Sequence, residues 1–115
     1  MQAITPAQLD DWIRQETTDG AATPALLDVR EPWELQTASA PSGPGYELLA
    51  MPMRSVPARL AELERDRPIA VLCHHGGRSA QVARFLQDQG YTRVVNVHGG
   101  IDRWSQERDP SIPRY

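Results

Sequence analysis

The chain has 115 residues, a net charge of −3 and a hydrophobic fraction of 40%, values typical of one globular domain rather than of a disordered chain. The excess of acidic side chains excludes a generally basic nucleic-acid-binding surface, and no apolar run is long enough to span a bilayer. The single cysteine, Cys73, excludes an internal disulfide. Because residues 1–10 also lack the features of a secretory signal, we expect residues 1–115 to form a single cytoplasmic domain.

The first half of the chain alternates between helical and extended patterns. A helix capped by Thr5 is expected over residues 6–17, where a proline stands at the first helical position and apolar residues recur at helical spacing. The apolar stretch 25–29 is typical of a strand covered on both faces. A short helix is expected over 32–37, and residues 38–46, rich in proline, glycine and serine, should form a loop.

The second half continues this alternation. In order, we expect a short buried strand at 48–51, a helix from Ser55 to about Glu64, a buried strand at 69–72, a helix at 79–89, a strand at 94–97 and a last helix after Gly99-Gly100. Strands separated by helices imply right-handed crossovers. The sequence therefore predicts an α/β fold, an open parallel sheet with helices on both faces.

The segment around Cys73 runs from a predicted strand through a glycine-containing loop into a predicted helix. Ligands of open α/β sheets bind beyond the carboxyl ends of the strands, which is where Cys73 stands. Gly76 and Gly77 allow backbone N–H groups to turn inward, and the helix directs its positive end to the same point. Arg78 adds a guanidinium suited to oxyanions. These residues predict a site for an anion, first the Cys73 thiolate and then an anionic substrate.

Three motifs, in this order, resemble the rhodanese-like sulfurtransferase family. They are Leu27-Asp28-Val29-Arg30-Glu31, Cys73-His74-His75-Gly76-Gly77-Arg78-Ser79 and Gly99-Gly100-Ile101-Asp102-Arg103-Trp104, which correspond to the family patterns D-V-R-E, C-x-x-G-x-R-S and G-G-x-x-x-W. The resemblance implies a sheet of about five parallel strands. It also implies a sulfurtransferase, similar to thiosulfate sulfurtransferase (rhodanese), that moves a sulfane sulfur from a donor such as thiosulfate to cyanide or a thiol through a Cys73 persulfide.

On this interpretation Cys73 and Arg78 are the expected catalytic residues. Cys73 attacks the outer sulfur of the donor, while the loop amides and Arg78 stabilise the persulfide and the departing oxyanion. The expected substrate-binding residues are His74, His75, Gly76, Gly77, Ser79 and Arg30. No metal or cofactor is expected. The expected partners are a small anionic sulfur donor and a cyanide or thiol acceptor, with thioredoxin or another sulfur-accepting protein among the acceptors, but neither nucleic acid nor a membrane.

Other functions remain open at this point. A non-catalytic interaction module on the same fold would typically lack the cysteine, which this chain keeps. Related phosphatases use a C-x5-R loop, whereas Cys73 to Arg78 is the tighter C-x4-R, so a phosphatase or an arsenate reductase is less favoured. A metal site of Cys73, His74, His75 and His98 is disfavoured because adjacent histidines in a tight loop diverge. The family's G-H-I-x-G-A stretch is replaced here by residues 36–46, which leaves the donor preference open.

Overall fold

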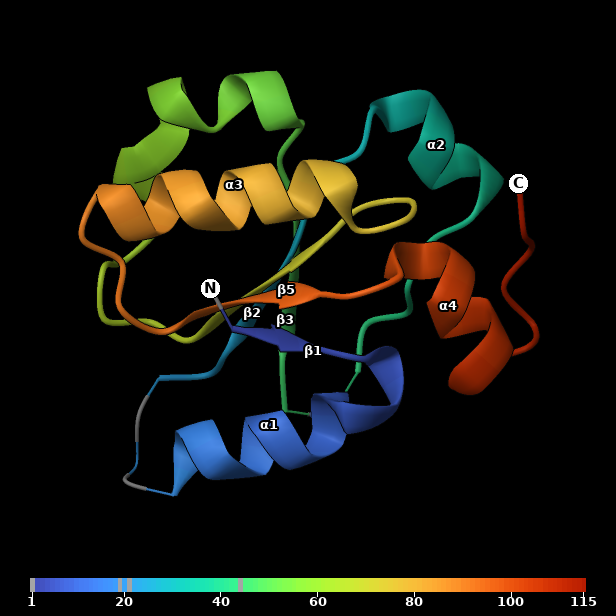
Figure 1. The fold of residues 1–115 in the computed structure, drawn as a ribbon, viewed down its shortest axis with the longest axis horizontal. Helices are drawn as coiled ribbons and strands as arrows, with labels where there is room; N and C mark the ends of the chain where they lie inside the picture. The colour runs from blue at the N-terminus through green and yellow to red at the C-terminus, as the bar shows by residue number, and fades with distance from the viewer. Residues whose placement is uncertain (1, 19, 21, 44) are drawn as a thin grey trace.

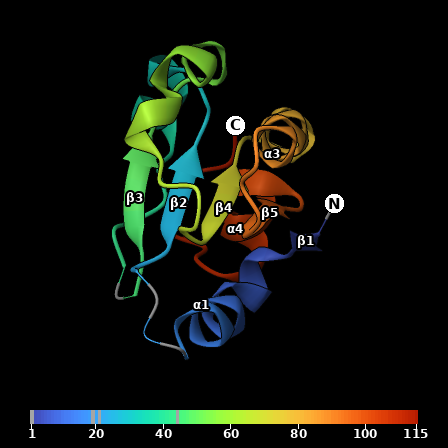
Figure 2. The same ribbon diagram turned by 90° about the vertical axis from the view of Figure 1, so that its left-hand side faces the viewer.

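The computed structural model describes residues 2–18, 20, 22–43 and 45–115 (Figure 1). Five strands, all parallel, form one sheet in the order β1-β5-β4-β2-β3. They are β1 (Ala3–Ile4), β2 (Ala25–Asp28), β3 (Glu47–Ala50), β4 (Ile69–Leu72) and β5 (Val94–Val97). Figure 2 shows them side by side with their carboxyl ends at one edge of the sheet. The predicted α/β class and five-stranded parallel sheet are confirmed.

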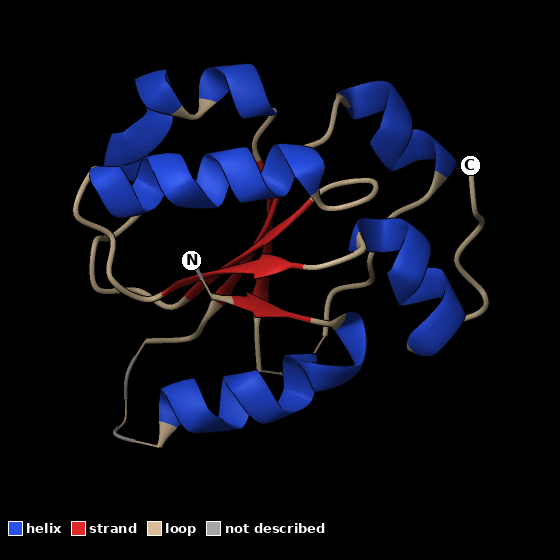
Figure 3. Ribbon diagram, viewed as in Figure 1, coloured by secondary structure: helices blue, strands red, loops and turns tan. Residues whose placement is uncertain are grey.

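Helices cover both faces of this sheet (Figure 3). One face packs against α1 (Leu9–Thr17), which continues the 3-10 turn η1 (Pro6–Gln8), and against α4 (Gly100–Glu107). The other face packs against α3 (Gly77–Asp88) and the 3-10 segments η2 (Met53–Ser55) and η3 (Pro57–Glu62). The short helix α2 (Pro32–Thr37) follows the carboxyl end of β2.

Double coverage explains the unbroken apolar strands. Side chains alternate between the two faces of a strand, so Ala70 of β4 belongs to the core with α1 and α4, whereas Val71 belongs to the core with α3. Trp104 of α4 is completely buried in the first core, and Leu86 of α3 in the second. Because both faces exclude water, β4 is buried at all four of its positions, as its sequence predicts.

The helix predicted from Ser55 to Glu64 is replaced by two 3-10 segments. Pro57 has no N–H to continue an α-helical hydrogen-bond ladder, and the backbone at Arg59 is non-helical, with φ of −111°. Ser55 ends η2 instead of capping a helix, and its hydroxyl donates to the Pro52 carbonyl. The α-helical prediction for this segment is therefore wrong, although Leu63 is buried as expected.

Two strands also differ from expectation. Sequence analysis missed β1, because a strand of two residues is too short to show an alternation of apolar and polar side chains. It is recruited by pairing with β5, in which Ile4 lies opposite Val97. The predicted buried strand at 48–51 is instead the edge strand β3, where Leu48 and Leu49 are only half-buried, because β2 is its sole neighbour in the sheet.

The remaining elements follow the sequence patterns closely. α2 spans residues 32–37 and β5 spans 94–97, as predicted, and residues 38–43 and 45–46 contain neither helix nor strand. None of the helices in the described part of the chain is both long and apolar enough to cross a membrane. The fold brings the carboxyl ends of β4 and β5 together where α3 and α4 begin, and this edge of the sheet holds the candidate site.

Candidate active site

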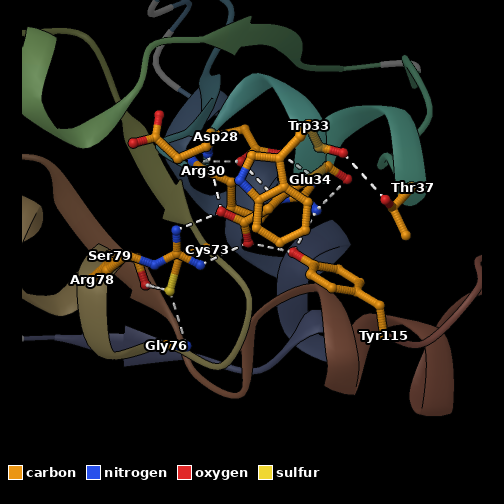
Figure 4. Close-up of polar contacts among 11 residues, drawn as sticks. Asp28, Arg30, Trp33, Glu34, Thr37, Cys73, Gly76, Arg78, Ser79 and Tyr115 are labelled. Atoms are coloured by element: carbon orange, nitrogen blue, oxygen red, sulfur yellow. Dashed lines mark hydrogen bonds and ion pairs between the residues drawn. The ribbon is translucent and has the colours of Figure 1, made fainter.

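Cys73 directly follows β4 and lies against the first turn of α3 (Figure 4). Its Sγ accepts a hydrogen bond from the Gly76 amide at 3.0 Å and lies 3.2 Å from the Ser79 hydroxyl oxygen. Gly76 has φ of +108°, a conformation that favours glycine and accompanies the amide's approach to the sulfur. Cys73 is only 1% exposed. Hydrogen-bond donors at a helix start stabilise negative charge on sulfur, so this loop is suited to an anionic sulfur species.

The buried side-chain amide of Asn96, in β5, supports the Cys73 loop by hydrogen bonds. The Ser79 hydroxyl donates to Asn96 Oδ1, and Asn96 Nδ2 donates to the Gly76 carbonyl at 3.3 Å. Asn96 therefore connects the loop and the start of α3 to the sheet. Sequence analysis missed this residue, although a polar side chain within Val94–Val97 was a usable signal, because buried amides in proteins are normally hydrogen-bonded.

Gly99 and Gly100, at the start of α4, allow the Cys73 loop to pack closely against that helix. The amides of Ile101 and Asp102 donate to the carbonyls of Cys73 and His74, at 2.8 and 3.1 Å. A Cβ on Gly100 would lie 2.4 Å from both carbonyl oxygens, so any larger residue would push the loop away. The G-G-x-x-x-W motif thus positions the backbone of Cys73 by close packing.

Arg78 lies in the first turn of α3, but its charge is already paired. Its Nη1 and Nη2 donate to the two carboxylate oxygens of Glu34 in α2, at 2.7 and 2.8 Å. The hydrogen bonds from Arg78 lower the pKa of Glu34 to about 2, against the opposing effect of burial. The same hydrogen bonds raise the pKa of Arg78. The unpaired cation expected from the sequence is therefore a neutralised ion pair.

Tyr115 joins this ion pair to the Cys73 loop. Its hydroxyl donates to Glu34 Oε2 at 2.6 Å and accepts from Arg30 Nη1 at 3.0 Å. Its ring stacks on His74, with centroids 3.8 Å apart and planes 4° apart. Burial, and then the hydrogen bond to Glu34, raise the pKa of Tyr115 to about 12, while burial lowers the pKa of His74. At neutral pH Tyr115 therefore keeps its proton and His74 is uncharged.

The structure separates the predicted loop residues into those near the sulfur and those away from it. The Gly76 amide and the Ser79 hydroxyl contact the Cys73 sulfur itself. Gly77 begins α3 and is exposed. His75 is also exposed and stacks on His74, with ring centroids 3.8 Å apart. The described contacts thus place Gly76 and Ser79 at the sulfur, and the two histidines toward Tyr115.

Arg30, expected from the sequence to bind substrate, is occupied by contacts within the protein. The side chain is completely buried. Its Nε and Nη2 donate to the carboxylate of Asp28, at 3.0 and 2.7 Å, and its Nη1 supports Tyr115. A carboxylate buried in the interior needs such a partner. The described contacts of Arg30 are thus structural, and its role in substrate binding stays a prediction.

Glu34 and Tyr115 were both missed by sequence analysis. Glu34 stands three residues after Glu31 and accepts the Glu31 amide at 3.1 Å, a spacing that indicates a helix start but says nothing about Arg78. Tyr115 lies 81 residues from Glu34 in the sequence, so no local pattern connects them. For the alternative metal site, no group of three or more His, Cys, Asp or Glu side chains suited to a metal ion occurs within the described residues.

The low pKa of Glu34 predicts an acid-dependent loss of stability. Because its pKa falls from an ordinary 4.5 to about 2 on folding, Glu34 stabilises the fold fully above about pH 4.5, and this contribution is lost as the pH falls toward 2. Glu34→Gln is expected to flatten this part of the curve of unfolding free energy against pH, measured by urea denaturation. Glu62→Gln, which removes an exposed pair with Arg59, should keep nearly the wild-type slope. Parallel curves for wild type and Glu34→Gln would contradict the assignment.

Known proteins are similar in sequence to this chain over most of its length. The rhodanese-like domain family matches residues 5–107. A protein of Allochromatium vinosum named sulfurtransferase is 36% identical over 87 residues, covering 76% of this chain and 77% of that protein. The rhodanese-like/PpiC domain-containing protein 12 of Arabidopsis thaliana is 44% identical over 94 residues, which cover 78% of this chain but only 30% of the plant protein.

The fold is shared with solved structures of the same kind. The crystal structure of a rhodanese-related protein from Thermoplasma volcanium matches over the full length of both chains, with a TM-score of 0.74 and 32% sequence identity. This structural match agrees with the five-stranded parallel sheet, and the family match covers residues 5–107. The chain belongs to the rhodanese-like sulfurtransferase family.

Proposed function

We propose that this protein transfers a sulfane sulfur from a donor such as thiosulfate to cyanide or a thiol, carrying it on Cys73 as a persulfide. The observation that supports the proposal is the buried Cys73 sulfur, which accepts the Gly76 amide at 3.0 Å and lies beside Ser79 at the start of α3. The hydrogen bond from the Gly76 amide and the positive end of α3 stabilise a thiolate before the reaction and a persulfide anion after it. The relative from Allochromatium vinosum, named sulfurtransferase, supports the same reaction class.

The reaction has two nucleophilic steps. In the first, the Cys73 thiolate attacks the outer sulfur of thiosulfate, a new S–S bond forms, the old one breaks, and sulfite leaves with its electron pair. In the second, the acceptor attacks the outer sulfur of the persulfide and releases the Cys73 thiolate. Cyanide then becomes thiocyanate, whereas a thiolate becomes a new persulfide. Each step is a transfer at sulfur, so the chain needs no further oxidant or reductant.

The neighbouring residues have distinct proposed roles. The Gly76 amide donates a hydrogen bond to the reacting sulfur, and the Ser79 hydroxyl lies beside it. The exposed residues Gly77 and His75 border the approach to the loop. Arg78 is the proposed catalytic cation for an anionic leaving group. Its bidentate pair with Glu34 means that such a group must share or displace a carboxylate.

Intact-protein mass spectrometry tests the proposal directly. After incubation of the wild-type protein with thiosulfate, and separately with glutathione persulfide, we expect a mass gain of one sulfur atom. Because the chain has a single cysteine, a gain that cyanide removes as thiocyanate must have been carried by Cys73. Protein that gains no sulfur from either donor would contradict the proposed function.

A further inference from the structure

We propose that Glu34 is a specificity-determining residue that disfavours sulfonate-bearing donors such as thiosulfate and leaves organic persulfides as the preferred donor class. This inference rests on the sulfur-transfer function proposed above. It concerns the identity of the donor and goes beyond the reaction type.

The geometry of the ion pair is the first part of the argument. A guanidinium binds carboxylate and other oxyanions through the same two-pronged arrangement. Glu34 already binds Arg78 in this way: Arg78 Nη1 lies 2.7 Å from Glu34 Oε1, and Arg78 Nη2 lies 2.8 Å from Glu34 Oε2. The Arg78 side chain is 35% exposed but that of Glu34 only 3%. The carboxylate therefore holds the inner side of the guanidinium, toward the protein, and is itself shielded from water.

Glu34 is also held firmly in this position. Besides Arg78, it accepts the Tyr115 hydroxyl at 2.6 Å and the Glu31 amide at 3.1 Å. Figure 4 shows it between Arg78 and Tyr115. With a pKa of about 2, it stays ionised at neutral pH. A second anion cannot take its place without breaking these charge-assisted hydrogen bonds.

Arg30 and His74, the other basic side chains that contact Tyr115, add no free positive charge for a donor. Arg30 is committed to Asp28 through Nε and Nη2. His74, which stacks on Tyr115, is uncharged at neutral pH because burial lowers its pKa. Apart from the Gly76 amide and the start of α3, the positive charge of this cluster that is partly exposed belongs to Arg78, and Glu34 balances it.

The two donor classes place different charges beside this carboxylate. Thiosulfate carries its sulfonate directly on the transferred sulfur, and attack by Cys73 releases sulfite with a double negative charge, which Arg78 can bind only by competing with Glu34. An organic persulfide, R–S–SH, transfers its outer sulfur, with the attached hydrogen, to Cys73. A new S–S bond forms to Cys73, the S–S bond of the donor breaks, and R–S⁻ leaves as a thiolate. The thiolate carries one negative charge and takes a proton from water. Repulsion from Glu34 therefore penalises thiosulfate more than a persulfide.

Glu34→Gln tests this inference because glutamine keeps the size and can still accept from Tyr115, but carries no charge. Steady-state kinetics would be compared for thiosulfate and glutathione persulfide at neutral pH, with Glu62→Gln as the control. Glu62 forms a similar bidentate pair with Arg59, at 2.8 and 2.8 Å, in η3 and away from the site. We expect Glu34→Gln to raise kcat/KM for thiosulfate by about tenfold or more, chiefly through KM. The value for glutathione persulfide should change far less, and the control should resemble wild type with both donors.

A second variant tests the same inference if Glu34→Gln folds poorly. Tyr115→Phe removes the hydroxyl that donates to Glu34 Oε2 and accepts from Arg30. Glu34 is then held less firmly on Arg78 and is easier to displace, so the donor ratio should shift toward thiosulfate by a smaller factor. A wild-type donor ratio in well-folded variants at both positions would overturn the inference and leave the proposed function standing. Wild-type protein that accepts sulfur from neither donor would overturn the proposed function and this inference with it.

Discussion

Replacing Cys73 with serine is expected to abolish sulfur transfer without disturbing the fold. The serine hydroxyl can keep the hydrogen bond from the Gly76 amide and the contact with Ser79. It cannot form the sulfur–sulfur bond that the reaction requires, because an oxygen nucleophile replaces the thiolate. Loss of a covalent nucleophile typically lowers turnover by on the order of 10⁴-fold or more. Thiocyanate formation from thiosulfate and cyanide is the measurement.

The control for this prediction is the stability of the same variant. Circular dichroism and the urea midpoint of Cys73→Ser should resemble those of wild type, because the site is small and the substituted atom keeps its neighbours. Thiocyanate formation at a rate close to wild type by the serine protein would show that the sulfur does not pass through Cys73.

Replacing Arg30 with methionine is expected to cause the largest loss of stability. Asp28 and Arg30 are 1% and 0% exposed, and the guanidinium is bonded to both carboxylate oxygens. Methionine fills much of the space but leaves the Asp28 carboxylate buried without a counter-charge. Breaking a buried ion pair in this way costs about 3–5 kcal/mol. Urea denaturation at neutral pH would measure the change in the free energy of unfolding.

The chain offers a matched comparison for this substitution. Arg59→Met breaks the exposed pair with Glu62 and should change stability little. The double variant Asp28→Leu with Arg30→Met should be more stable than Arg30→Met alone, because no unpaired charge is then buried. If Arg30→Met unfolded at the wild-type urea concentration, Asp28 would not depend on Arg30 for its burial.

The backbone of the Cys73 loop was predictable because its parts are contiguous. A strand, a cysteine, two glycines and a helix start lie within Ile69–Ser79, and their chemistry depends on backbone conformations that local residues favour. The structure bears this out at Gly76, whose positive φ accompanies the hydrogen bond to sulfur. The same locality made α2 and β5 predictable to the residue. Where a local rule was overridden by Pro57, the predicted helix became 3-10 segments.

The charge of the site was not predictable in this way. The sequence presented Arg78 as a free cation and Arg30 as a residue near the substrate, yet each is bound to a carboxylate. For Arg30 the partner is only two residues away, but its burial depends on the packing of β2 against its neighbours. For Arg78 the partner, Glu34, is 44 residues distant. Neither ion pair can be predicted from the spacing of apolar residues or from the spacing of the motifs.

The sequence by itself determined the α/β sheet, the family and the position of the sulfur-bearing cysteine, because periodicity, caps and glycine conformations act over a few residues. Only the tertiary structure decided what surrounds that cysteine. Glu34, Asn96 and Tyr115 come from α2, β5 and the segment after α4, and they reach the same loop because parallel strands bring their carboxyl ends to one edge of the sheet. The electrostatics of the site are set by contacts between segments distant in the chain, and these contacts exist only once the sheet has formed.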